Sequence, residues 1–274
     1  ASRLMLLDLQ QGTWSEVMLE ACGLSANLFA PLVESGSYLG KLHAEAAAAT
    51  GLVQGTAVVS GGHDHPCGAF ALGITRPGDV LDSMGTSESI FSVLPAPKLV
   101  PTLAQTGYQQ GFHVVAGSYY INGGLYTSGR CVEWLKDLLR LETNDPYAEL
   151  IQLATDAPAG SRGLMFLPHL RMANTPIDDP YSRGAFIGLS ISSTRECIAR
   201  ALFEGLAYEA QLSIDGLAEL FDVQPKRVCA VGGGSRNSLL MSIKAALLGK
   251  AIDVFAMDET TCLGAAMLAG LGAG

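Results

Sequence analysis

The order of the strand and helix patterns constrains the fold of this 274-residue chain most strongly. Two hairpin patterns, at residues 78–94 and 112–124, are followed by a strand–helix–strand–helix pattern over residues 227–271. Before the second group, Ser193 and Glu196 fit a capping box that opens a long helix to about Phe221. Antiparallel hairpins followed by βα units predict an α/β fold, with a mixed sheet flanked by helices.

The charge and the cysteines narrow the class of protein. A formal net charge of −9 with no basic block argues against binding to nucleic acid or to an anionic membrane. No apolar run reaches membrane-spanning length, and no signal peptide is visible. The six cysteines form no C-x-x-C pair, so we expect reduced, mostly buried thiols in a cytoplasmic protein.

Three glycine-bearing turns are candidates for phosphate binding. Gly85-Thr86-Ser87 lies at a predicted hairpin tip, whereas Asn122-Gly123-Gly124 and Gly232–Asn237 lie at predicted strand-to-helix junctions. Bare backbone N–H groups at such turns bind phosphate oxygens, although a single turn of this kind is more often a plain turn or cap. None is a Walker A loop or a G-x-G-x-x-G fingerprint. Together, the three turns predict a nucleotide cleft.

The stretch from Val58 to Ile74 places two histidines and an aspartate between apolar segments. We expect a buried strand over Thr56–Ser60 and a short helix over His65–Leu72. Three hypotheses fit His63, Asp64 and His65: a metal site, an Asp64 cap on the helix, or an Asp64 general base for phosphoryl transfer. The metal hypothesis lacks a second histidine-bearing motif, so we assign no metal ligand.

Motifs along almost the whole chain resemble, in order, those of the C-terminal half of the FGGY carbohydrate kinases, relatives of the actin-like ATPases. They are "GLVQGTAVVSGGHDHPCGAFALG", "MGTSE", "NGGLYTSGRCVEWL", "FLPHLRMANTPIDDPYSRGAFIGL", "ALFEGLAYEAQLSIDGL" and "VGGGSRNSLLMSIKAALLGKAIDV". The loop signature departs from the family at Ala173, where Gly or Glu is common. Because that loop is mainly structural, the departure casts little doubt on the site.

The resemblance implies a ribonuclease H-like, actin-like ATPase domain that forms the second lobe of a two-lobe sugar kinase. It implies ATP-dependent phosphorylation of a sugar or polyol hydroxyl, with ATP and Mg²⁺ as cofactors and Asp64 as the catalytic base. His63 and Asp64 are then the expected substrate contacts. The expected nucleotide contacts are Gly85, Thr86 and Ser87 at the phosphates, Gly123 and Gly124 along the nucleotide, and Gly233, Gly234 and Asn237 beside the adenosine.

The phosphate loop that opens the family's first domain, D-x-G-[TS]-T, has no counterpart here. "DLQQGTW" at Asp8–Trp14 has the wrong spacing. We therefore expect residues 1–55 to be the end of the first, sugar-binding domain and residues 56–274 to be the second, nucleotide-binding domain. The chain alone should be inactive without the first domain. A non-catalytic nucleotide-binding fragment or regulator, a metal-dependent hydrolase built on His63-Asp64-His65, and a homodimer all stay open.

Overall fold

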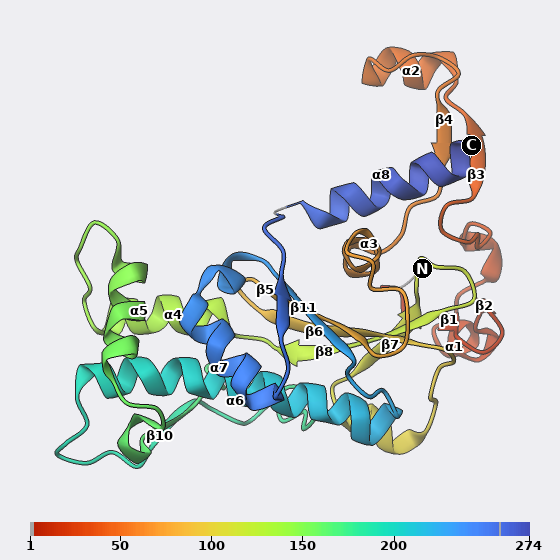
Figure 1. The fold of residues 1–274 in the computed structure, drawn as a ribbon. Coiled ribbons are helices and arrows are strands. Elements are labelled where there is room, and N and C mark those ends of the chain that lie inside the picture. Colours follow the sequence, from red (N-terminus) through yellow and green to blue (C-terminus); the bar gives the residue numbers. More distant parts are fainter. Residues whose placement is uncertain (1–2, 258) are drawn as a thin grey trace.

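A six-stranded mixed sheet forms the centre of the computed structural model, which describes residues 3–257 and 259–274 (Figure 1). The strand order is β12-β11-β5-β6-β8-β7. Strands β5, β11 and β12 are parallel, and the β5–β6, β6–β8 and β7–β8 pairs are antiparallel. The strands are β5 (Asp79–Met84), β6 (Glu88–Leu94), β7 (Gln109–Phe112), β8 (Tyr119–Leu125), β11 (Arg227–Val231) and β12 (Ile252–Val254). The predicted mixed sheet, with hairpins first and βα units later, is confirmed.

Both faces of the sheet are covered, so its central strands are almost continuously buried. Every residue of β6 is buried. Val80 and Ile90 pack toward α6 (Arg195–Phe221), whereas Leu81 and Phe91 pack with residues of α3 (Asp64–Ala71). A strand that is buried on both faces loses the alternation that marks a half-exposed strand.

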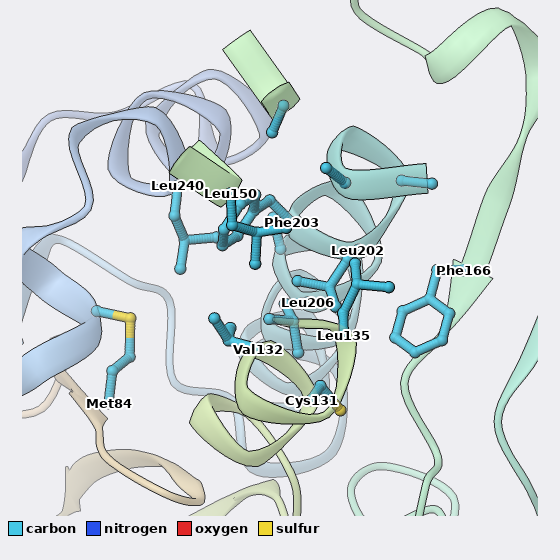
Figure 2. Close-up of a cluster of buried hydrophobic side chains, with 14 of the residues drawn as sticks. Met84, Cys131, Val132, Leu135, Leu150, Phe166, Leu202, Phe203, Leu206 and Leu240 are labelled. Atoms are coloured by element: carbon cyan, nitrogen blue, oxygen red, sulfur yellow. The ribbon is translucent and has the colours of Figure 1, made fainter. Parts of the chain in front are cut away.

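Helix α6 lies along one face of the sheet and organises the largest apolar cluster (Figures 1 and 2). Leu202 and Leu206 of α6 meet side chains of α4 (Gly129–Leu138), α5 (Pro146–Asp156) and α7 (Ser238–Leu248) in this cluster. The predicted capping box is wrong in detail: Thr194 is the N-cap of α6, and its side chain makes no capping hydrogen bond. The predicted end of the helix at Phe221 is confirmed.

The opposite face carries α3 and α8 (Thr260–Ala273), which cross each other closely. A Cβ at Gly264 of α8 would overlap the carbonyl oxygen of Cys67 in α3. Glycine is therefore required where the two backbones meet. This crossing fixes the start of α3, where Asp64 lies.

The remaining elements are short and lie outside the central sheet. The segment predicted as a buried strand, Thr56–Ser60, is largely exposed, because β4 pairs only with β3 in a two-stranded ribbon that projects from the body (Figure 1). The β-branched run between glycines predicted the strand correctly, but it gave no information on which strand would pair with it.

The short elements outside the central sheet are β1 (Leu7–Asp8), β2 (Thr13–Trp14), α1 (Glu16–Ala21), β3 (Tyr38–Lys41), α2 (Ala44–Thr50), β4 (Ala57–Val59), β9 (Met165–Leu167), β10 (Ala185–Ile187) and the 3-10 turns Ala26–Leu28, Pro101–Gln105, Ser161–Gly163 and Gly233–Arg236.

The cysteines agree with the expectation of reduced, mostly buried thiols. All six cysteines are free thiols, and only Cys22 and Cys262 are exposed. Among the described residues, no helix combines the length and apolarity that a bilayer crossing requires.

Candidate active site

Two of the predicted glycine turns meet at one cavity of about 350 Å³. The turn between β5 and β6 contributes Gly85 and Thr86, and the turn after β11 contributes Gly233 and Gly234. Because β5 and β11 are parallel neighbours, their carboxyl ends and following turns lie at the same edge of the sheet. The remaining lining comes from Met84, Leu206 and Leu240, from Tyr147, and from residues of the first turns of α4.

The β5–β6 turn has free backbone donors beside this cavity. The N–H of Gly85 closes the turn by donating to the carbonyl oxygen of Ser87 at 2.8 Å. Among the described residues, the N–H groups of Thr86 and Ser87 donate to no protein acceptor. Free, adjacent N–H donors of this kind form a concavity that binds anions such as phosphate. Ser87 itself is not among the residues that line the cavity.

The start of α4 supports this turn, a role that the sequence analysis missed. The N–H groups of Gly129 and Arg130 donate to the carbonyl oxygens of Gly85 and Thr86 at 3.1 and 3.2 Å. A Cβ at Gly129 would stand 2.6 Å from the Gly85 carbonyl oxygen, so only glycine permits this approach. Ser128 and Gly129 stand at the start of the amphipathic helix α4, and a Ser-Gly pair at a helix start gives no sign of a contact with a distant turn.

The turn after β11 requires glycine for close contact with β5. Gly232 has φ +89°, and a Cβ there would overlap the carbonyl oxygen of Met84. A Cβ at Gly234 would stand 2.8 Å from that of Met84. Asn237 is fully buried and is the N-cap of α7, where its Oδ1 accepts from the Leu240 N–H at 3.1 Å. Its expected contact with adenosine stays a prediction, because Asn237 does not line the cavity.

Gly123 and Gly124 do not occupy the predicted strand-to-helix junction, because both lie inside β8. Gly124 has φ +127°, and a Cβ there would overlap the carbonyl oxygen of Glu88 in β6. A Cβ at Gly123 would stand 2.7 Å from Thr175 Cγ2. Close packing within the sheet therefore accounts for both glycines, and neither lines the cavity. The expected contacts along the nucleotide stay a prediction.

Asp64 and His63 line a second cavity of about 1380 Å³. Asp64 is the first residue of α3, and the N-cap is His63, so the hypothesis that Asp64 caps the helix is wrong. Asp64 Oδ1 accepts from the His65 N–H at 2.9 Å and lies 2.9 Å from His63 Nε2. Arg3 Nε stands 3.0 Å from the same ring nitrogen. The three side chains therefore form one cluster at the cavity.

The cluster keeps Asp64 ionised and His63 neutral. Burial acts to raise the pKa of Asp64, but the His65 N–H, the His63 and His65 rings and Arg3 together lower it below its ordinary value. Burial lowers the pKa of His63, although Asp64 opposes that effect. The Asp64 side chain is 59% exposed, so substrate can reach it. An ionised, accessible carboxylate at a cavity can accept a proton.

The two cavities share no lining residue in the part of the chain that the structure describes. The structure therefore brings Gly85, Thr86, Gly233 and Gly234 together, and it brings His63 and Asp64 together, but it keeps these two groups apart. The metal hypothesis gains no support either: residues 3–257 and 259–274 contain no group of three His, Cys, Asp or Glu residues able to hold a metal ion.

His113 in the lining of the larger cavity should make the chain sensitive to acid. The residue is 5% exposed, and burial lowers its pKa to about 4 against an ordinary value of 6.5. The unfolded chain therefore binds more protons than the folded chain between pH 6.5 and 4, so stability is lost as the pH falls through that window. The loss should approach about 3 kcal/mol.

Urea unfolding at pH 4 and pH 7 measures this effect. His113→Gln should remove the part of the acid destabilisation that comes from His113, whereas His43→Gln on the exposed start of α2 should retain it. If the free energy of unfolding of His113→Gln changes between pH 7 and pH 4 as much as that of the unaltered chain, groups other than His113 cause the sensitivity to acid.

Comparisons with known proteins complete the description of the site. The FGGY C-terminal domain of the carbohydrate kinases matches residues 81–273, and the FGGY N-terminal domain matches residues 1–71. The chain belongs to the FGGY family of carbohydrate kinases. Both glycine turns lie within the C-terminal match, whereas Asp64 lies near the end of the N-terminal match. The expected division at residue 55 stays a prediction.

Xylulose kinase of Bacillus subtilis (strain 168) is 31% identical over the whole chain, which covers 54% of that protein. Autoinducer-2 kinase of Escherichia coli (strain K12) is 30% identical over 98% of the chain and 52% of the relative. The crystal structure of xylulose kinase from Rhodospirillum rubrum has a TM-score of 0.87 and 34% identity over 98% of this chain and 53% of that one. The chain thus spans about half the length of these FGGY relatives, and the actin-like ATPase fold expected for the family is confirmed.

Proposed function

We propose that this chain is the nucleotide-binding part of an ATP-dependent kinase that phosphorylates a hydroxyl of a sugar or polyol. The observation that carries the proposal is the 350 Å³ cavity where the β5–β6 turn and the turn after β11 meet. The free N–H groups of Thr86, which lines this cavity, and of the adjoining Ser87 suit phosphates, and the glycines of the lining let a ligand approach the backbone. Membership of a carbohydrate kinase family supports the same function.

Phosphoryl transfer needs positioning and charge stabilisation more than covalent chemistry from the protein. In the proposed mechanism, Thr86 and Ser87 hold the phosphates of ATP through their N–H groups. Asp64 accepts the proton of the attacking hydroxyl, and the His63 ring, 2.9 Å from Asp64 Oδ1, orients the carboxylate. Because the two cavities are separate here, we infer that closure of a complete two-lobe enzyme brings the terminal phosphate to the acceptor.

Mg²⁺ is the usual companion of ATP in phosphoryl transfer, where it neutralises charge on the phosphates. In the part of the chain that the structure describes, no group of three or more His, Cys, Asp or Glu side chains could hold a metal ion by itself. Magnesium often binds through substrate phosphates with few protein ligands, so we propose that it arrives with the nucleotide and assign it no residue.

A substrate panel tests the proposed function. The full gene product is assayed for ADP release with pentuloses, hexoses and polyols, beginning with D-xylulose and autoinducer-2 because relatives carry those names. We expect sugar-dependent ADP release by the gene product with both lobes, and ATP binding without turnover by the present chain. ATP binding with no turnover on any member would favour a non-catalytic regulator, and absent ATP binding would contradict the proposal.

A further inference from the structure

A fully buried charged cluster lies directly behind the β5–β6 turn. Lys244 of α7 places its Nζ 2.6 Å from Asp82 Oδ2 and 2.7 Å from Glu88 Oε1. The side chains are at most 2% exposed. Lys244 Nζ also lies 3.3 Å from Met84 Sδ. None of the catalytic steps above uses this cluster.

Overall stability is a poor explanation for such a cluster. Removing three charged groups from water costs free energy that their mutual attraction often fails to recover, and well-packed apolar residues frequently do as well or better. Asp82 Oδ1 is buried with no hydrogen-bond partner among the described residues, so the cluster is not even fully satisfied. A specific geometric role accounts better for three charges at this depth.

The positions of the two carboxylates indicate that role. Asp82 is near the end of β5 and Glu88 begins β6, so the pair brackets Gly85-Thr86-Ser87 on both sides. Lys244 bonds both carboxylates at once and thereby ties the two strands together where the turn leaves the sheet. The second oxygen of Glu88 accepts from Ser128 Oγ at 2.7 Å, which extends the connection to the N-cap residue of α4.

We propose that Lys244 is a positioning residue that sets the shape of the β5–β6 turn for phosphate binding by holding Asp82 and Glu88 together. The proposal rests on the function proposed above, because it assumes that this turn binds the phosphates of ATP. Lys244 does not line the cavity and so acts through the turn rather than on the ligand.

The charge states agree with this arrangement. Burial acts to lower the pKa of Lys244, but Asp82 and Glu88 raise it above its ordinary value, so the lysine is charged at neutral pH. Burial and the neighbouring Glu88 raise the pKa of Asp82 to about 7.

Comparing ATP with adenosine tests the proposal, because only ATP needs the turn. Isothermal titration measures both affinities for this chain and for Lys244→Met. We expect the dissociation constant for ATP to rise at least ten-fold while that for adenosine changes less than two-fold. Lys250→Met, at an exposed lysine just after α7, is the matched control and should leave both affinities within two-fold.

Circular dichroism and thermal melting establish that each variant is folded. If Lys244→Met does not fold, the triple variant Asp82→Asn, Glu88→Gln, Lys244→Met removes all three charges together and should show the same selective loss of ATP affinity. A folded variant that keeps its preference for ATP, or that loses both ligands equally, would overturn the positioning role. An unaltered chain that binds ATP no better than adenosine would instead contradict the proposed function.

Discussion

Asp64→Asn should reduce sugar-dependent ADP release by the full gene product by about 10²–10⁴-fold, the usual contribution of a general base. Asparagine keeps the shape of the side chain and can still accept the His65 N–H bond, but it cannot take the hydroxyl proton. The dissociation constant for ATP should stay within two-fold, because Asp64 lines the larger cavity and not the 350 Å³ cavity proposed for the nucleotide.

Initial-rate kinetics with a saturating sugar and titrated ATP separate these two effects. Asp178→Asn, an exposed aspartate in the loop before β10, is the matched control and should behave as the unaltered protein. Turnover of Asp64→Asn within a few-fold of the unaltered enzyme would show that Asp64 is not the base.

Gly264→Ala should destabilise the chain by about 3 kcal/mol, the upper part of the usual range for overpacking. The added Cβ would meet the Cys67 carbonyl oxygen of α3, and backbone atoms cannot rotate away as the end of a side chain can. The expected fall in melting temperature is about 6–12 °C. Because the Thr261 hydroxyl at the start of α8 donates to the Asp64 carbonyl oxygen at 3.3 Å, a shift of α8 should also disturb Asp64.

Gly270→Ala provides the matched control in the same helix. A Cβ at Gly270 meets no atom within 4 Å, so alanine should stabilise the chain by up to about 1 kcal/mol through its higher helix propensity. Similar melting temperatures for the two variants would mean that α3 and α8 do not pack as described. If Gly264→Ala in the full gene product also lowers sugar-dependent ADP release at a temperature where the variant is folded, that loss would support the role of the α3–α8 crossing in placing Asp64.

Local patterns predicted the elements well but their environments less well. Apolar runs ended by Gly85 and Gly232 indicated strands followed by turns, because these signals depend on neighbouring residues alone. The same reasoning placed residues 56–60 in a buried strand, although burial depends on a partner sheet that the segment lacks here. Glycine is required both at turns and at close backbone contacts, so Gly123 and Gly124 were predicted in a turn although both belong to the last three residues of β8.

The cavity at the sheet edge was predicted only as far as its turns. Gly85, Thr86, Gly233 and Gly234 line one cavity because turns that follow parallel strands meet at one sheet edge, and their contacts with a nucleotide stay a prediction. The sequence did not predict that Gly129 supports the β5–β6 turn, and it did not predict the buried ion pair between Lys244 and Asp82. Residues 82 and 244 are far apart in the sequence, and a single lysine in an otherwise apolar helix carries no local sign of a buried partner.

A crystal structure of this chain with bound ADP tests the central claim most directly. We expect the phosphates at the N–H groups of Thr86 and Ser87 and the adenosine beside Gly233 and Gly234, in the cavity where the turns after β5 and β11 meet. A nucleotide bound instead in the larger cavity around Asp64, or at any site away from these two turns, would contradict the account.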